Sequence, residues 1–104
     1  MKSDGQKITE KGSFVTIDGK RIKIGILNRD SGNARVFGSG ERAKIKGIFG
    51  LVQWYRRGEP LEKIAYNLVA TSIREAEEEM AIWMPKLQYP AFRETSRLIR
   101  IVEI

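Results

Sequence analysis

Apolar and polar residues alternate through the early part of the chain, as they do in strands with one buried face. In the stretch SFVTIDGKRIKIGIL, two β-rich runs flank Asp18-Gly19, a pair that suits the positive φ angles of a two-residue type I′ turn. With these two residues as the loop, Ile17 faces Lys20 and Phe14 faces Lys23. One side of the hairpin is then apolar (Val15, Ile17, Ile22, Ile24 and Ile26), and the other carries Phe14, Thr16, Arg21 and Lys23.

The pattern continues beyond this hairpin. A turn around residues 30–32 and a short strand at about 34–37 predict a three-stranded antiparallel meander over about 13–37. The next segment, GSGERAKIKG, has Arg42, Lys44 and Lys46 at alternate positions, which an extended chain places on one side. Its glycines lack the spacing of the known phosphate-binding loops, so we predict a basic linker and no nucleotide site.

From Ile48 onward the apolar spacing changes from two to about 3.6 residues, which predicts helices. A first helix is expected at about 47–57, with Gly58 just past its end, and a second at about 60–68, with Pro60 in its first turn. Ser72 and Glu75 have the spacing of a capping box, which predicts a third helix that stops at Pro85.

The remaining segment contains a loop around Pro90 and a final strand at about 97–104, whose apolar residues fall on both faces. The strand therefore pairs inside a sheet or against another chain. Together these elements predict a single α+β domain over residues 1–104. It comprises a flexible arm (1–12), a basic β-rich part (13–46), a three-helix part (47–84) and a loop with the final strand (85–104).

The predicted helices over about residues 48–84 resemble the helix-turn-helix, or trihelical, unit of small bacterial and archaeal regulators. The matching positions are Gly58, Leu61, Ile64, Ala65, Leu68, Ser72, Ile73 and Ala76. The resemblance implies a DNA-binding regulator whose third helix reads the major groove. That helix is acidic here, with Glu75, Glu78 and Glu79 on its outer side, and only Arg74 is suited to reading a base.

Charge is distributed unevenly along the chain. Residues 1–58 hold thirteen Lys and Arg against five Asp and Glu, a net +8, whereas residues 59–104 carry a net −2. A basic half favours an anionic partner, and nucleic acid fits better than a membrane because no basic amphipathic helix lies there. Candidate phosphate contacts are Arg21, Lys23, Arg42, Lys44, Lys46, Arg56 and Arg57, with Arg74 as a possible base contact.

Composition removes many kinds of chemistry. The chain has no cysteine and no histidine, so thiolate or imidazole nucleophiles, bases and metal ligands are lacking. We expect no enzyme activity, no metal and no cofactor. The polar N-terminal stretch does not resemble a signal peptide, and no apolar run approaches the length of a membrane helix, so a cytoplasmic protein is expected. Abundant Lys, Arg, Glu and Ile also suit a thermophilic source.

Two functions follow from these patterns. The first is a small nucleic-acid-binding protein, a DNA-binding regulator or accessory protein that contacts phosphates through its basic first half, with duplex DNA favoured over RNA or single strands. The second is a non-enzymatic interaction or structural protein, a homodimer or a subunit of a complex. This protein would use the acidic third helix and the final strand as its contact surfaces.

Overall fold

The computed structural model describes residues 14–36 and 46–104, and within these ranges the chain is mostly β-structure. The elements are six strands, β1 (Phe14–Ile17), β2 (Lys20–Asn28), β3 (Asn33–Val36), β4 (Ile48–Arg56), β5 (Glu59–Asn67) and β6 (Glu94–Glu103), one helix α1 (Ile73–Trp83) and two short 3-10 helices, η1 (Met84–Lys86) and η2 (Pro90–Phe92). None of the helices in these ranges is long and apolar enough to span a membrane.

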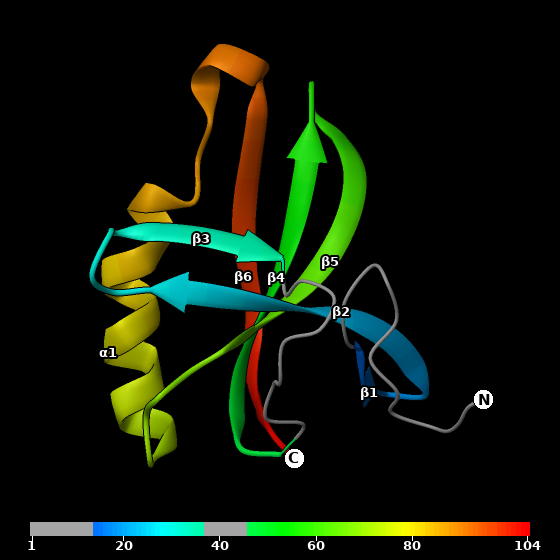
Figure 1. Ribbon diagram of the computed structural model, residues 1–104. Helices are drawn as coiled ribbons and strands as arrows, with labels where there is room; N and C mark the ends of the chain where they lie inside the picture. The colour runs from blue at the N-terminus through cyan, green and yellow to red at the C-terminus, as the bar shows by residue number, and fades with distance from the viewer. Residues whose placement is uncertain (1–13, 37–45) are drawn as a thin grey trace, which may run out of the picture.

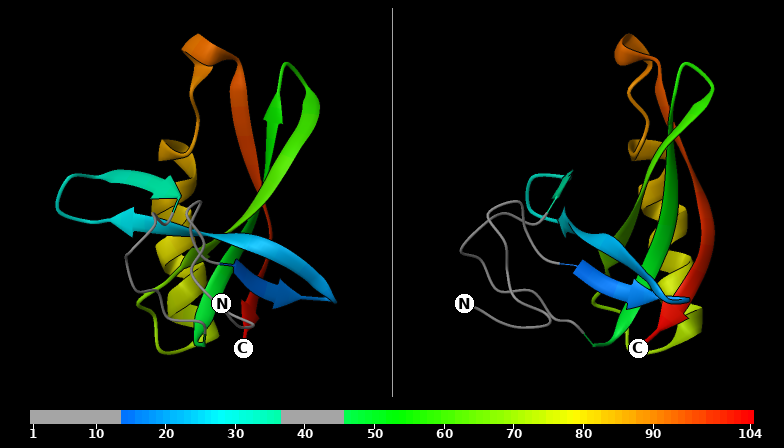
Figure 2. Two further views of the ribbon diagram at one scale, coloured as in Figure 1. Left: turned by 45° about the vertical axis from the view of Figure 1, so that its right-hand side comes forward. Right: turned by 90° about the vertical axis from the view of Figure 1, so that its right-hand side faces the viewer.

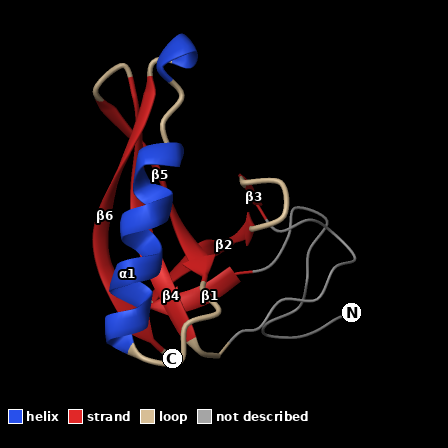
Figure 3. Cartoon of the chain, turned by 90° about the vertical axis from the view of Figure 1, so that its left-hand side faces the viewer, coloured by secondary structure: helices blue, strands red, loops and turns tan. Residues whose placement is uncertain are grey.

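All six strands belong to one mixed sheet. Its order is β1-β2-β5-β4-β6, with β3 paired to β2. Strands β2 and β5 run parallel, and the other pairs are antiparallel. Helix α1 covers one face of β4, β5 and β6 (Figures 1 and 3), while the β1–β2 hairpin crosses their other face. The hairpin lies toward one end of these long strands, and the end with the β4–β5 turn projects beyond it (Figure 2).

The sheet separates two apolar cores, and β4 contributes to both. Ile48, Val52 and Trp54 point toward α1, where they meet Met80 and Trp83. Phe49 and Leu51 point the opposite way and pack under the β1–β2 hairpin. A strand that is buried on both faces loses the alternation of a half-buried strand, because both sets of side chains must be apolar.

The first hairpin confirms the predicted register. Phe14 pairs with Lys23 and Ile17 with Lys20, and the loop residues Asp18 and Gly19 have φ angles of 54° and 78°, as a type I′ turn requires. The apolar side of the hairpin faces the core, as predicted from its alternation: Val15, Ile17, Ile22 and Ile24 are buried, and Ile26 is half-buried. The charged turn also contacts the last strand, because Asp18 forms an ion pair with Arg100.

Helix α1 confirms the third predicted helix and its cap. The Ser72 side chain accepts a hydrogen bond from the Glu75 backbone N–H at 3.1 Å. The Glu75 carboxylate accepts from the backbone N–H and the hydroxyl of Thr71 at 2.9 and 2.8 Å, one residue before the cap. These hydrogen bonds stabilise the ionised form and lower the pKa of Glu75 below its ordinary value.

The two helices predicted before α1 are wrong, and with them the three-helix α+β fold and the helix-turn-helix. Residues 48–56 and 59–67 form the antiparallel pair β4–β5. Arg57 and Gly58, read from the sequence as a helix end, form the two-residue turn of this hairpin, with φ angles of 52° and 84°. Pro60 lies near the beginning of β5, before the segment that pairs with β2, and next to a register shift in the pairing with β4. The N–H that proline lacks is therefore not needed for a hydrogen bond to β2.

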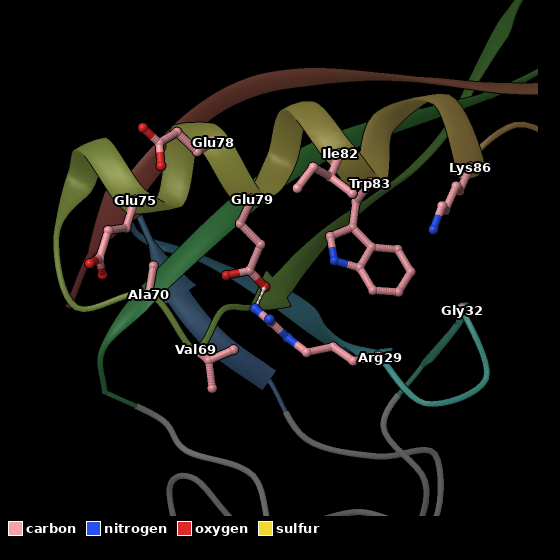
Figure 4. Close-up of a pocket in the computed structure, with 10 residues that line it drawn as sticks. All are labelled: Arg29, Gly32, Val69, Ala70, Glu75, Glu78, Glu79, Ile82, Trp83 and Lys86. Carbon is pink, nitrogen blue, oxygen red and sulfur yellow. Dashed lines mark ion pairs between the residues drawn. The ribbon is translucent and has the colours of Figure 1, made fainter.

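An ion pair connects α1 to the turn after β2. Arg29 Nη2 lies 2.8 Å from Glu79 Oε2 (Figure 4), and Glu79 is only 8% exposed although it sits on a mostly acidic helix. The contact is electrostatic, because Oε2 has no partner that satisfies hydrogen-bond geometry within the described residues. The Glu79 carboxylate therefore depends on Arg29 for compensation of its buried charge.

Removing the arginine is expected to destabilise the fold. Arg29→Ala leaves the Glu79 carboxylate buried without a counter-charge, and we expect a loss of about 2 kcal/mol because Arg29 itself is largely exposed. Urea unfolding measures the change. The double variant Arg29→Ala/Glu79→Gln removes the stranded charge and should recover part of the loss. Equal stability of the single and double variants would contradict the role of this pair.

Candidate nucleic-acid interface

The candidate residues from the sequence do not come together in one patch. Lys46 and Arg74 lie near the end of the molecule where β4 and α1 begin, whereas Arg56 and Arg57 lie at the opposite end, at the β4–β5 turn (Figure 1). Arg21 lies on the β1–β2 hairpin, close to its turn. Arg42 and Lys44 lie outside the described residues.

Several of these cations already have partners. Lys23 Nζ lies 3.1 Å from Glu62 Oε1, and Arg56 Nη2 lies 2.8 Å from Glu94 Oε2. Arg74 lies 3.9 Å from Glu78 on the exposed side of α1. Their attraction for a phosphate is reduced, because each already has a carboxylate beside it.

Phe14 is partly buried, and the guanidinium of Arg21 lies 4.6 Å from the centre of its ring. This contact already covers part of the ring face on which a base could stack.

An alternative surface appears where β4, β5 and β6 extend beyond the hairpin. Trp54 and Arg56 lie on the α1 side of β4, together with Glu62 of β5. Strand alternation therefore places Gln53, Tyr55 and Lys63 on the opposite face. Arg97 and Thr95 of β6 pair with Gln53 and Tyr55 and share that face.

This face carries two adjacent rows of side chains across the sheet. The first row is Lys63, Gln53 and Arg97, and the second contains Tyr55 and Thr95. Lys63 and Arg97 are exposed, Tyr55 is half-buried between them and the turn, and Gln53 is fixed by hydrogen bonds from Nε2 to the carbonyl oxygens of Trp54 and Glu62. The result is an aromatic ring with a cation on each neighbouring strand.

Two loops continue this surface at the tip of the sheet. The Arg57 backbone N–H donates to the Arg93 carbonyl oxygen at 2.9 Å, so the β4–β5 turn and the loop before β6 support each other. Both arginines have left-handed backbones, with φ of 52° and 56°, a conformation that costs energy in residues other than glycine. Beside them Phe92 is 71% exposed. Backbone strain and an exposed aromatic side chain are common at binding sites.

We call these residues of the face and the two loops the tip surface: Gln53, Tyr55, Arg57, Lys63, Phe92, Arg93, Thr95 and Arg97. Within the described part of the chain, its four cations form no ion pair with a carboxylate. The tip surface is therefore positively charged, with Tyr55 and Phe92 among the cations.

Of the residues in the tip surface, only Arg57 was predicted from the sequence. Lys63 was placed in a helix, and Arg93 and Arg97 lie in the half of the chain with a net negative charge. A signal was present, since Arg57-Gly58 also suits a type I′ turn. A hairpin around that pair places Tyr55 opposite Pro60, but it is the register shift next to Tyr55 that brings Lys63 opposite Gln53 and onto the face of Tyr55.

A separate hollow lies between α1 and the β2–β3 turn (Figure 4). It measures about 660 Å³ and is lined by charges of both signs, including Glu75, Glu78, Lys86 and the Arg29–Glu79 pair. No group of three acidic side chains in the described residues is arranged to hold a metal ion. This hollow offers a mixed-charge lining and no concentrated positive field for an anion.

Comparison with known proteins gives no relative from which a role could be transferred: no family model matches the chain, and no curated protein or solved structure matches it.

Proposed function

We propose that the protein binds nucleic acid on the tip surface and prefers unpaired strands. The observation that carries this proposal is the position of Tyr55 beside the row of Lys63, Gln53 and Arg97, on a sheet face that the hairpin leaves uncovered. Sheet-based binders of single strands combine these features, because cations hold the backbone while aromatic rings stack on bases. A cytoplasmic setting is part of this proposal.

The shape of the surface favours a single strand over the duplex expected from the sequence. The three strands β5, β4 and β6 span about 10 Å at the usual strand spacing, enough for one backbone with its bases against the sheet. Stacking on Tyr55 or Phe92 also requires a base whose face is free, and in a duplex that face is covered by the neighbouring base pairs.

Salt dependence tests this proposal. Fluorescence anisotropy with labelled single-stranded DNA, single-stranded RNA and duplex DNA of one length should show the tightest binding to the single strands. With four phosphate contacts, log K should fall against log salt with a slope of about −3. A flat salt response, or no binding to any oligonucleotide at low salt, would contradict the proposal. Tighter binding to the duplex would contradict the preference for unpaired strands.

Strand β6 favours a second candidate function. It lies at the edge of the sheet, and its outer side pairs with no other described strand. Leu98 and Ile99 are exposed along it, and Ile104 is exposed directly after its end. A long apolar edge strand readily pairs with another chain. Light scattering separates the two candidates: a stable dimer without oligonucleotide affinity would favour an interaction protein.

A further inference from the structure

A small aromatic pocket lies on the α1 side of the sheet, behind the tip surface. It measures about 300 Å³, and its walls include Trp54, Tyr66 and Tyr89. The rings of Trp54 and Tyr89 are stacked, 5.5 Å apart at their centres and 7° from parallel. Two backbone hydrogen bonds between Tyr89 and Glu94, of 2.8 and 3.1 Å, anchor the backbone that carries the tyrosine. The walls are therefore flat, apolar and preorganised.

Polar groups line the same pocket. Trp54 Nε1 donates to the Tyr66 hydroxyl oxygen at 2.9 Å. Burial raises the pKa of Tyr66 above its ordinary value, so the hydroxyl keeps its proton and can donate it. Arg56 donates hydrogen bonds from Nε and Nη2 to one carboxylate oxygen of Glu94, and one carboxylate oxygen of Glu62 accepts a hydrogen bond from Lys23. Within the described residues, the other carboxylate oxygens of Glu62 and Glu94 and the Nη1 group of Arg56 have no hydrogen-bond partner. Both acceptors and donors therefore remain for a ligand.

These features favour a planar heterocycle over an organic cation. Aromatic pockets that bind ammonium groups act through the ring faces, usually with uncompensated negative charge nearby. Here Glu62 and Glu94 are compensated by Lys23 and Arg56, and Arg56 itself lines the pocket as a cation. A flat ring that carries donors and acceptors on its edge fits both the apolar walls and the mixed polar groups.

We infer that this pocket binds a single nucleobase, with the ring against the Trp54–Tyr89 wall and its edge toward Arg56 and the two carboxylates. The choice of a nucleobase as the heterocycle rests on the proposed function. Because a carboxylate accepts a hydrogen bond from the amino group of cytosine, whereas uracil presents an oxygen at that position, cytidine should bind better than uridine.

Nuclear magnetic resonance with free nucleosides tests this inference. The chain has two tryptophans and hence two indole N–H signals, which the variant Trp83→Phe assigns. Titration with cytidine should shift the Trp54 signal and leave that of Trp83 in place, uridine should act more weakly, and choline should have no effect. A shift with choline and none with cytidine would identify a cation site and overturn the inference.

Two pocket variants and one control complete the test. Tyr89→Ala removes half of the stacked wall and should weaken cytidine binding about tenfold. Leu61→Phe narrows the pocket at a residue that is 41% exposed, so the fold should persist while the cytidine shift is lost. Ile82→Ala removes an exposed apolar side chain of α1 that lies outside both the pocket and the tip surface, and it should leave the cytidine shift unchanged.

The inference and the proposed function can fail separately. If single strands bind to the tip surface and no nucleoside shifts the Trp54 signal at millimolar concentrations, the pocket inference is wrong and the proposed function stands. If cytidine shifts Trp54 and no oligonucleotide binds, the pocket is a nucleoside site and the proposed function is wrong. A cytidine shift that persists in both Tyr89→Ala and Leu61→Phe would overturn the pocket assignment.

Discussion

Replacing Gly25 by valine is expected to destabilise the protein by about 3 kcal/mol or more. Gly25 pairs with Tyr66 across β2 and β5, and the tyrosine ring occupies the space where a side chain would begin. A Cβ atom at residue 25 would stand 2.5 Å from Tyr66 Cδ1 and 2.7 Å from Ile64 Cγ2, closer than real carbon atoms approach. Both neighbours are buried, so neither can move aside without disturbing the core. Urea denaturation measures the loss.

A second glycine supplies the control. At Gly50 a Cβ would meet Met80 Sδ at 2.7 Å, but the methionine side chain is unbranched and flexible, so it can repack around one added carbon. Gly50→Ala should therefore be less destabilising than Gly25→Ala. If both variants unfold at the same urea concentration, the rigid contact between Tyr66 and residue 25 does not control stability.

The double charge reversal Lys63→Glu/Arg97→Glu is expected to weaken single-strand binding about a hundredfold or more at low salt. Both cations lie in one row across β5, β4 and β6, so their reversal places two carboxylates where a phosphate chain would pass. Both side chains are exposed, so the fold should be retained. Fluorescence anisotropy gives the affinity, and thermal unfolding by circular dichroism checks the fold.

The matched control is Arg74→Glu/Lys86→Glu, which changes net charge by the same amount away from the tip surface. Arg74 lies in the first turn of α1 and Lys86 lies in η1, just after the end of α1, and both are exposed. This control should lose much less affinity, because only long-range attraction is altered. An equal loss in the two double variants would show that net charge alone drives binding. A larger loss of affinity in the control would indicate that α1 contacts the nucleic acid, as the helix-turn-helix resemblance implied.

Local turn and cap chemistry made part of the fold predictable. Asp18-Gly19 determined the turn and with it the register of β1 and β2, and Ser72 with Glu75 identified the start of α1. Each of these signals involves only residues that are close together in the sequence, so it can be recognised without the structure. The last strand was also predicted, although it begins at Glu94, three residues before the expected start.

The region 48–67 failed because its apolar spacing suits two structures. β4 is buried on both faces, so its apolar residues form a nearly continuous run that fits a helical period as well as a strand. Its β-branched and aromatic content favours a strand over a helix, with Ile48, Phe49, Val52, Trp54 and Tyr55 within nine residues. A glycine with positive φ, such as Gly58, occurs both after helices and in hairpin turns, so it does not distinguish a helix end from a hairpin.

The candidate site was less predictable than the fold because it depends on pairing across the chain. Lys63 and Arg97 are 34 positions apart in the sequence. They lie in one row only because their strands, β5 and β6, both pair with β4. Counting charge by halves of the chain assigned Arg97 to an acidic region. The count could not detect that Arg56 and Lys23 would be matched by Glu94 and Glu62.

The strand order also has a consequence for the way the chain assembles during synthesis. Three pairings, β1–β2, β2–β3 and β4–β5, are local hairpins that can form within microseconds, but β2–β5 and β4–β6 join distant segments. β6 is synthesised after both β4 and α1. One edge of β4, the most buried strand of the sheet, therefore stays unpaired until β6 has been synthesised. Until β6 arrives, the apolar edge of β4 is the part of the nascent chain most exposed to wrong pairing.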